Sequence, residues 1–183
     1  ERIVNTILGN KSLPQFQRDN AKDWLATIKK WKSEKAPKSE NLLKKAERIL
    51  QEARKGEDYW GDRSSYVHYL RASALLHDFL RGQGSTEEQG QALFYLGQAY
   101  EVVSDMGVGD TNEFYYKACI KRSPHSTLAM NCYERLEQNF FLDQSGEEGL
   151  RFPPGAMEYL RALREMAAPL DGAGSDKEMF KRE

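Results

Sequence analysis

The sequence predicts an all-α domain made of stacked antiparallel helix hairpins. Apolar residues recur at steps of three and four along most of the 183 residues, glycines and prolines interrupt this pattern at intervals, and no stretch alternates β-branched with polar residues. The clearest segment is 85–106, whose apolar residues fall on two helical stripes: Leu93, Leu96, Tyr100 and Val103, and Tyr95, Ala99, Val102 and Met106. A helix that is apolar on most of its circumference belongs between neighbours, so the rest of the chain should pack on both sides of it.

The first part of the chain predicts a lead-in followed by a helix. Residues 1–16 contain a glycine and a proline among apolar residues, which favours an irregular or short helical lead-in. A leading helix at 18–32 places two tryptophans and an isoleucine on one face. Pro37 ends this segment, because proline disfavours helical geometry in the residue before it. Ser39 is the expected N-cap of the next helix.

Three helix pairs are predicted between residues 40 and 167. Short turns separate the helices, and the pairs span residues 40–81, 86–122 and 126–167. Ser85 is the expected cap of the central helix, Pro153 or Pro154 opens the last one, and a polar tail follows at 168–183. None of these helices can bury its apolar face alone, and stacking the hairpins solves that problem. We therefore expect one domain of about seven helices.

Composition argues against several classes of protein. The 27 lysines and arginines balance 28 aspartates and glutamates, and both signs are scattered along every predicted helix. This distribution lacks the basic patch of a nucleic-acid binder and the polybasic cluster of a membrane-surface segment. The apolar runs are also far shorter than the ~20 residues that cross a bilayer. We expect no nucleic-acid partner and no membrane insertion of this segment.

One predicted helix pair carries the signature positions of a known repeat: Leu93-x-x-Leu96-Gly97-x-x-Tyr100 in the first helix, and Tyr115-x-x-Ala118 with Pro124 in the second. These positions resemble the tetratricopeptide repeat, in which the glycine lets the paired helices approach closely and large residues fill the space around it. The resemblance covers residues 90–124, with two additional residues in the turn and the proline one position late. A generic antiparallel helical bundle is the alternative fold.

The resemblance implies a protein- or peptide-binding scaffold whose inner surface is lined by the first helix of each pair. Carried onto this chain, the lining positions are Gln91, Phe94, Gln98 and Glu101. The basic residues and asparagine with which the family grips a terminal carboxylate are absent at these positions, so an acidic C-terminal tail is not the expected ligand. The alternative is that Phe94 packs against the neighbouring pair and the three polar residues are merely solvated.

The remaining motifs add one candidate contact and no catalytic or metal site. Trp60 is a candidate partner contact, because tryptophan is enriched at recognition hot spots, although it could equally plug the end of a hairpin. His68 and His77 lie nine residues apart, half a turn out of phase on a helix. Neither a Cys–His cluster nor a paired-histidine motif exists, so the sequence predicts no metal site and no cofactor.

Cys119 and Cys132 are the only cysteines, and they lie almost equally far from the turn near His125. In an antiparallel hairpin they would stand at the same height, and both lie on apolar stripes. A disulfide requires Cα atoms within about 4.4–6.8 Å, so the two side chains must point directly across the helix seam. Two predictions stay open: a disulfide, which would favour an oxidising, extracytoplasmic compartment, or two reduced, buried thiols.

The sequence therefore predicts a non-enzymatic scaffold module that binds a protein or peptide. One alternative is an accessory domain of a larger extracytoplasmic assembly, such as an envelope or redox complex. The other is an enzyme whose all-α active site carries no recognisable motif. Because the chain starts at Glu1 and not at a methionine, this end does not indicate the compartment.

Overall fold

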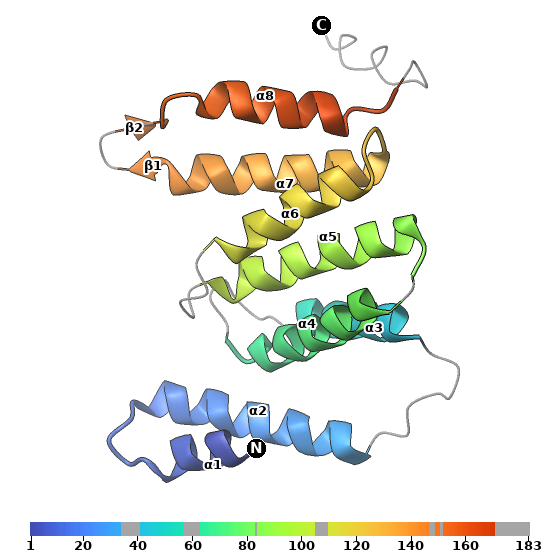
Figure 1. Ribbon diagram of the computed structural model, residues 1–183. Helices are drawn as coiled ribbons and strands as arrows, with labels where there is room; N and C mark the ends of the chain where they lie inside the picture. The colour runs from blue at the N-terminus through green and yellow to red at the C-terminus, as the bar shows by residue number, and fades with distance from the viewer. Residues whose placement is uncertain are drawn as a thin grey trace, which may run out of the picture.

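A computed structural model describes residues 1–33, 41–56, 63–82, 84–104, 110–146, 149–150 and 152–170. The described residues form eight α-helices and one antiparallel pair of two-residue strands (Figure 1). The helices are α1 (Arg2–Gly9), α2 (Gln15–Ser33), α3 (Leu42–Lys55), α4 (Tyr66–Arg81), α5 (Thr86–Val102), α6 (Thr111–Arg122), α7 (Thr127–Asp143) and α8 (Ala156–Ala167). The strands are β1 (Ser145–Gly146) and β2 (Gly149–Leu150).

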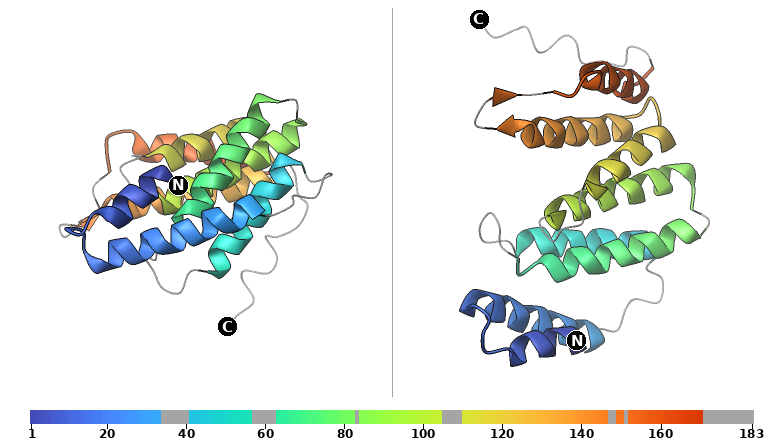
Figure 2. Two further views of the ribbon diagram at one scale, coloured as in Figure 1. Left: turned by 90° about the horizontal axis from the view of Figure 1, so that it is seen from below. Right: turned by 60° about the vertical axis from the view of Figure 1, so that its left-hand side comes forward.

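The helices stack in chain order, from the α1–α2 hairpin at one end to α8 at the other (Figures 1 and 2). From α3 onward, each helix packs mainly against the next, and α3 and α7 also contact α5 directly. The first helices of the three predicted pairs are therefore neighbours. The predicted all-α fold of stacked antiparallel hairpins is confirmed. Eight helices are described instead of about seven, because the lead-in contains α1, which packs against α2.

The central helix α5 begins at the predicted cap. The Ser85 hydroxyl accepts a hydrogen bond from the Glu88 backbone N–H (3.2 Å), and the Glu88 carboxylate accepts one from the Ser85 N–H (2.9 Å). This reciprocal capping box satisfies two donors that the helix itself leaves unpaired. The helix ends at Val102, earlier than the predicted end at residue 106, which lies outside the described residues.

Two other helix starts differ from the prediction. Asn41 caps α3, because its side chain accepts a hydrogen bond from the Lys44 N–H (2.8 Å); the predicted cap Ser39 lies outside the described residues. The last helix begins after Gly155 and not at the preceding prolines. Gly155 has a φ of 80°, a left-handed conformation that glycine adopts without steric cost, so the chain turns once more before the helix starts.

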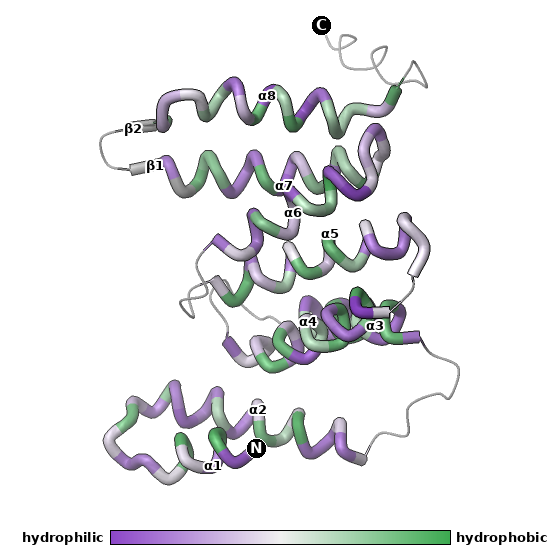
Figure 3. The backbone as a smooth tube through the Cα atoms, in the orientation of Figure 1, coloured by the Kyte–Doolittle hydropathy of each residue, from purple (hydrophilic) through white to green (hydrophobic). Residues whose placement is uncertain are grey.

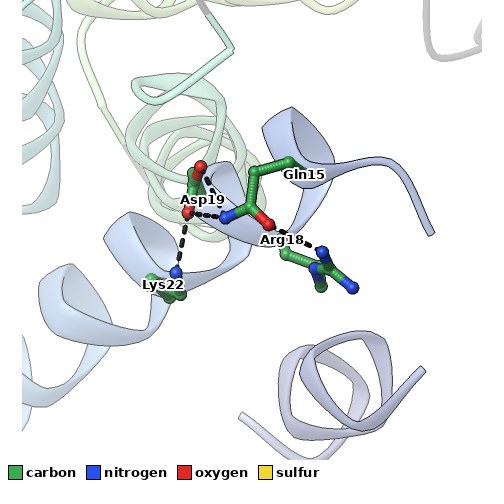
Figure 4. Close-up of polar contacts among 4 residues, drawn as sticks. All are labelled: Gln15, Arg18, Asp19 and Lys22. Atoms are coloured by element: carbon green, nitrogen blue, oxygen red, sulfur yellow. Dashed lines mark hydrogen bonds and ion pairs between the residues drawn. The ribbon is translucent and has the colours of Figure 1, made fainter. Parts of the chain in front are cut away.

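The α1–α2 hairpin joins the stack through the tryptophan face of α2. The Trp24 indole Nε1 donates a hydrogen bond to the Arg63 carbonyl oxygen (2.7 Å). Trp31 meets the His68 ring edge-on, and the Arg71 guanidinium lies 4.1 Å from the Trp31 ring centre. At the other end of α2, an exposed polar network links four residues of the first two turns (Figure 4): Gln15, Arg18, Asp19 and Lys22.

The core consists of two clusters of buried side chains that meet at α5. The first cluster comes from α3, α4 and α5 and includes Ile49, Leu76 and Leu96. The second comes from α6, α7 and α8 and includes Ile120, Leu136 and Leu160. Phe94 of α5 packs against both clusters, and hydrophobic positions recur along each of these helices (Figure 3). Most of both apolar stripes of α5 contributes to the first cluster, whereas Leu93 and Phe94 pack against the second, so this helix lies between neighbours.

Gly97 allows α5 and α6 to approach closely. The ring of Tyr116 on α6 is fully buried, and a Cβ atom at position 97 would lie 2.6 Å from its Cδ1 and 2.8 Å from its Cζ. Real Cβ atoms do not come so near to other carbon atoms, so only glycine fits here without displacing the ring. Leu96 is buried beside this contact, whereas Tyr100, which was expected at the same contact, is only partly buried.

We expect Gly97→Ala to destabilise the fold by about 1–3 kcal/mol, because the added methyl group overpacks the contact with Tyr116. This loss should exceed the gain from the higher helix propensity of alanine. Gly9→Ala is the control, since nothing lies within 4 Å of a Cβ atom there. The midpoint of chemical denaturation measures the effect, and a Gly97→Ala midpoint equal to that of the wild type would contradict it.

Cys119 and Cys132 form a disulfide between α6 and α7, with Cα atoms 6.4 Å apart. Both residues are completely buried within the second core cluster. The bond closes a short loop around the turn and ties the second helix pair to the third. Because neither sulfur is accessible in the folded chain, the disulfide acts as a structural cross-link.

Removing this cross-link should lower the free energy of unfolding by about 2–4 kcal/mol, because the unfolded chain regains loop entropy. The measurement is denaturation with and without reductant, with a Cys119→Ala/Cys132→Ala variant as the control that reductant should not affect. Titration of the unfolded, unreduced protein should find no free thiol. Two reactive thiols per chain would rule the bridge out.

Candidate binding groove

A groove open to solvent runs between α5 and α7. It encloses about 510 Å³ and is lined by six residues, here called the groove residues: Phe94, Gln98, Asn131, Glu134, Arg135 and Gln138. The four residues from α7 are exposed, whereas Phe94 and Gln98 are partly buried. The groove therefore has a floor on α5 and a polar wall on α7.

Phe94 and Gln98, two of the predicted partner contacts, lie in this groove. The Phe94 ring rests against Tyr95 and Tyr116, with ring centres 6.0 and 6.3 Å away, yet it keeps a partly exposed face. The Gln98 side chain accepts a hydrogen bond from the Arg54 guanidinium (2.5 Å), which extends the polar surface from α5 to α3. Phe94 thus packs against the core and reaches the groove at the same time.

The other predicted contacts lie elsewhere. Glu101 is beside the groove, where it pairs with Arg135 (3.4 Å) and accepts a hydrogen bond from the Tyr116 hydroxyl (2.5 Å). Gln91 lines a separate cavity of about 550 Å³ near the turn between α6 and α7, and its amide donates to the Tyr95 hydroxyl (2.9 Å). Trp60 lies outside the described residues.

Two tyrosines anchor the acidic side chains near the groove. Burial, and then the nearby charge of Glu101, raise the pKa of Tyr116 above its usual value. Burial and the hydrogen bond to Glu47, which the Tyr95 hydroxyl donates over 2.8 Å, raise the pKa of Tyr95 to about 12. Both phenols therefore remain protonated donors at neutral pH, and each fixes one carboxylate.

The α7 wall was not predicted, although the sequence contains a signal for it. Asn131, Glu134 and Gln138 repeat the spacing of Gln91, Phe94 and Gln98, at steps of three and then four. This spacing marks a polar face on the predicted helix, although the register of the third pair relative to the second could not be fixed from it. No sequence pattern predicts that Arg54 of α3 extends the polar surface of the groove. Its role depends on the tertiary contact between Arg54 and Gln98.

A second polar cluster lies where α4, α5 and α6 meet. The His77 Nε2 atom is 3.3 Å from the hydroxyl oxygens of both Tyr100 and Tyr115, whose rings stack with centres 5.2 Å apart. Burial lowers the pKa of His77, and the charge of Arg81 lowers it further. Burial also lowers the pKa of His68. These histidines are packing residues that favour the neutral form.

His125 holds the end of α8 against the turn between α6 and α7. Its backbone N–H donates to the Met166 carbonyl oxygen (2.9 Å), and its Nδ1 atom lies 2.9 Å from the Ala168 carbonyl oxygen. Across the described ranges, no three side chains of His, Cys, Asp or Glu gather closely enough to hold a metal ion. None of the helices that the structure describes combines the length and apolarity of a membrane span.

Comparison of the chain with protein-family models, curated proteins and solved structures finds no match.

Stability should increase with pH through the range where histidine titrates. The folded-state pKa values of His68 and His77 lie below the ordinary 6.5, so the unfolded chain binds more protons as the pH falls. Their contribution is fully present above about pH 6.5 and is lost as the pH falls towards the folded-state values. Urea midpoints at about pH 5.5 and about pH 7.5 measure this difference. It should shrink in the variant His68→Gln/His77→Gln, and an unchanged difference would contradict the assignment.

Proposed function

We propose that this domain is a non-enzymatic module that binds a protein or peptide in the groove between α5 and α7. The observation that carries the proposal is the partly exposed ring of Phe94 among the amide side chains of Gln98, Asn131 and Gln138. Amide side chains can donate hydrogen bonds to a peptide backbone and accept hydrogen bonds from it. The exposed face of the Phe94 ring can pack against an apolar side chain of the peptide.

The resemblance to the tetratricopeptide repeat supports the same function. In that repeat the first helix of each pair lines the binding surface, and the groove residues here come from α5 and α7, the first helices of two pairs. The close approach of Gly97 to Tyr116 also suits the glycine of the repeat signature.

The disulfide favours a second candidate, an accessory domain of a larger extracytoplasmic assembly. Cys119 and Cys132 are bonded and completely buried, and disulfides of this structural kind persist in oxidising compartments. This candidate is compatible with the first, because an accessory domain of an assembly would use the groove to hold its partner.

Alanine substitution in the α7 wall should weaken binding and leave the fold intact. Asn131→Ala/Gln138→Ala removes two exposed amides that form no side-chain hydrogen bond within the described part of the chain. The matched control, Arg161→Ala/Glu165→Ala, changes two exposed residues of α8. Peptides selected from a displayed library on the wild-type domain are assayed by fluorescence anisotropy.

We expect the α7 variant to weaken binding of the selected peptides at least about tenfold, since two backbone hydrogen bonds are lost, and the control to bind as the wild type does. Recovery of no binding peptide, or equal binding by both variants, would contradict the proposed function. Circular dichroism and the denaturation midpoint check that both variants fold.

A further inference from the structure

We infer that the ligand of the groove is an extended peptide segment with an apolar residue at its centre, an acidic residue towards α3 and a basic residue towards α7. This inference rests on the proposed function and assigns the chemistry of its partner. It follows from the exposed charges on α3 and α7, the two helices that contact α5 beside the groove.

A row of alternating charges crosses the three first helices. Arg54 on α3 is followed by Glu101 on α5 and then by Arg135 and Glu134 on α7. Glu101 and Arg135 form an ion pair with each other (3.4 Å), so their charges largely cancel. Among the described residues, neither Arg54 nor Glu134 forms an ion pair, and both are exposed.

These two exposed charges lie on different helices, α3 and α7, both of which contact α5. Arg54 contacts the groove through Gln98, whose amide oxygen accepts a hydrogen bond from its guanidinium over 2.5 Å. Glu134 lies in the α7 wall, and α5, which carries Phe94 and Gln98, contacts both α3 and α7. Glu47, another carboxylate of α3, also forms no ion pair with a described residue, but it is partly buried, lies about two turns from Arg54 along the helix and accepts a hydrogen bond from the Tyr95 hydroxyl.

Helix spacing sets the length of the segment. Packed helices have axes about 8–10 Å apart, so α3 and α7 are separated by roughly 16–20 Å across α5. An extended chain advances about 3.3 Å per residue. About five or six residues therefore separate the acidic from the basic side chain, and the apolar residue that covers Phe94 lies midway.

The amides suit an extended backbone running across the helices. Gln98, Asn131 and Gln138 flank Phe94, and the latter two have donors and acceptors that no described side chain occupies. They can bond the peptide groups on both sides of the central residue. These amides would bond only to the peptide backbone. The preference of the groove for particular peptide sequences therefore comes from Phe94 and from the charges of Arg54 and Glu134.

Three synthetic peptides of about ten residues test the charge pattern. All have a central leucine; one carries an acidic and a basic end residue, one carries two acidic residues, and one carries two basic residues. The wild-type domain should bind the acidic–basic peptide about tenfold more tightly than the other two, because each of them places like charges together at one side. Added salt should reduce this preference, since the charged groups are exposed.

Charge reversal should change the ranking in a defined way. Glu134→Lys should prefer the peptide with two acidic residues, Arg54→Glu the peptide with two basic residues, and the double variant the acidic–basic peptide again, since a peptide can bind in either direction. Glu165→Lys and Arg161→Glu on α8 make the same charge changes away from the groove and should leave the wild-type ranking unchanged.

The possible outcomes separate this inference from the proposed function. Equal affinity of the wild type for all three peptides, lost in Asn131→Ala/Gln138→Ala, would overturn the charge pattern and retain the groove as a peptide site. An order of peptide affinities that stays the same in Glu134→Lys and Arg54→Glu would also overturn the charge pattern and retain the groove as a peptide site. No binding of any of the three peptides would also overturn the inference, while the library selection separately decides whether the groove binds peptides.

Discussion

Between α5 and α6, the ring of Tyr116 occupies the space that a side chain at position 97 would need. This close approach brings the two core clusters together at α5. The hydroxyl of the same tyrosine donates to Glu101, and Glu101 pairs with Arg135 in the groove wall. Core packing and groove geometry are therefore linked through one side chain, and a shift of Tyr116 would move both.

Much of the fold could be predicted because it depends on local pattern. The apolar stripes and the cap at Ser85 located α5, and the predicted pair boundaries at residues 81, 122 and 126 agree within a residue with the ends of α4 and α6 and the start of α7. The start of α8 could not be predicted, because prolines suit the first turn of a helix, whereas the chain continues to Gly155. Helix α1 was uncertain because eight residues give a weak periodic signal.

The candidate site was only partly predictable, since a groove requires residues from more than one helix. Phe94 and Gln98 could be placed by their position in the repeat pattern, and both line the groove. Gln91 shares that helical face but lies nearer the N-terminal end of α5, where it lines a different cavity beside the turn between α6 and α7. The roles of Arg54 and Glu134 depend on how α3 and α7 sit beside α5, which is a tertiary property that no local pattern encodes.

The most direct test of the central claim, that α3, α5 and α7 form the binding face, is amide chemical-shift mapping of the isotope-labelled domain with a bound peptide. The largest changes should fall in the middle of α5, along the exposed face of α7 and near the end of α3, with small changes in α4, α6 and α8. Changes concentrated on α4, α6 and α8, or on the α1–α2 hairpin, would contradict the claim, because they would place the binding surface on the second helices or at the end of the stack.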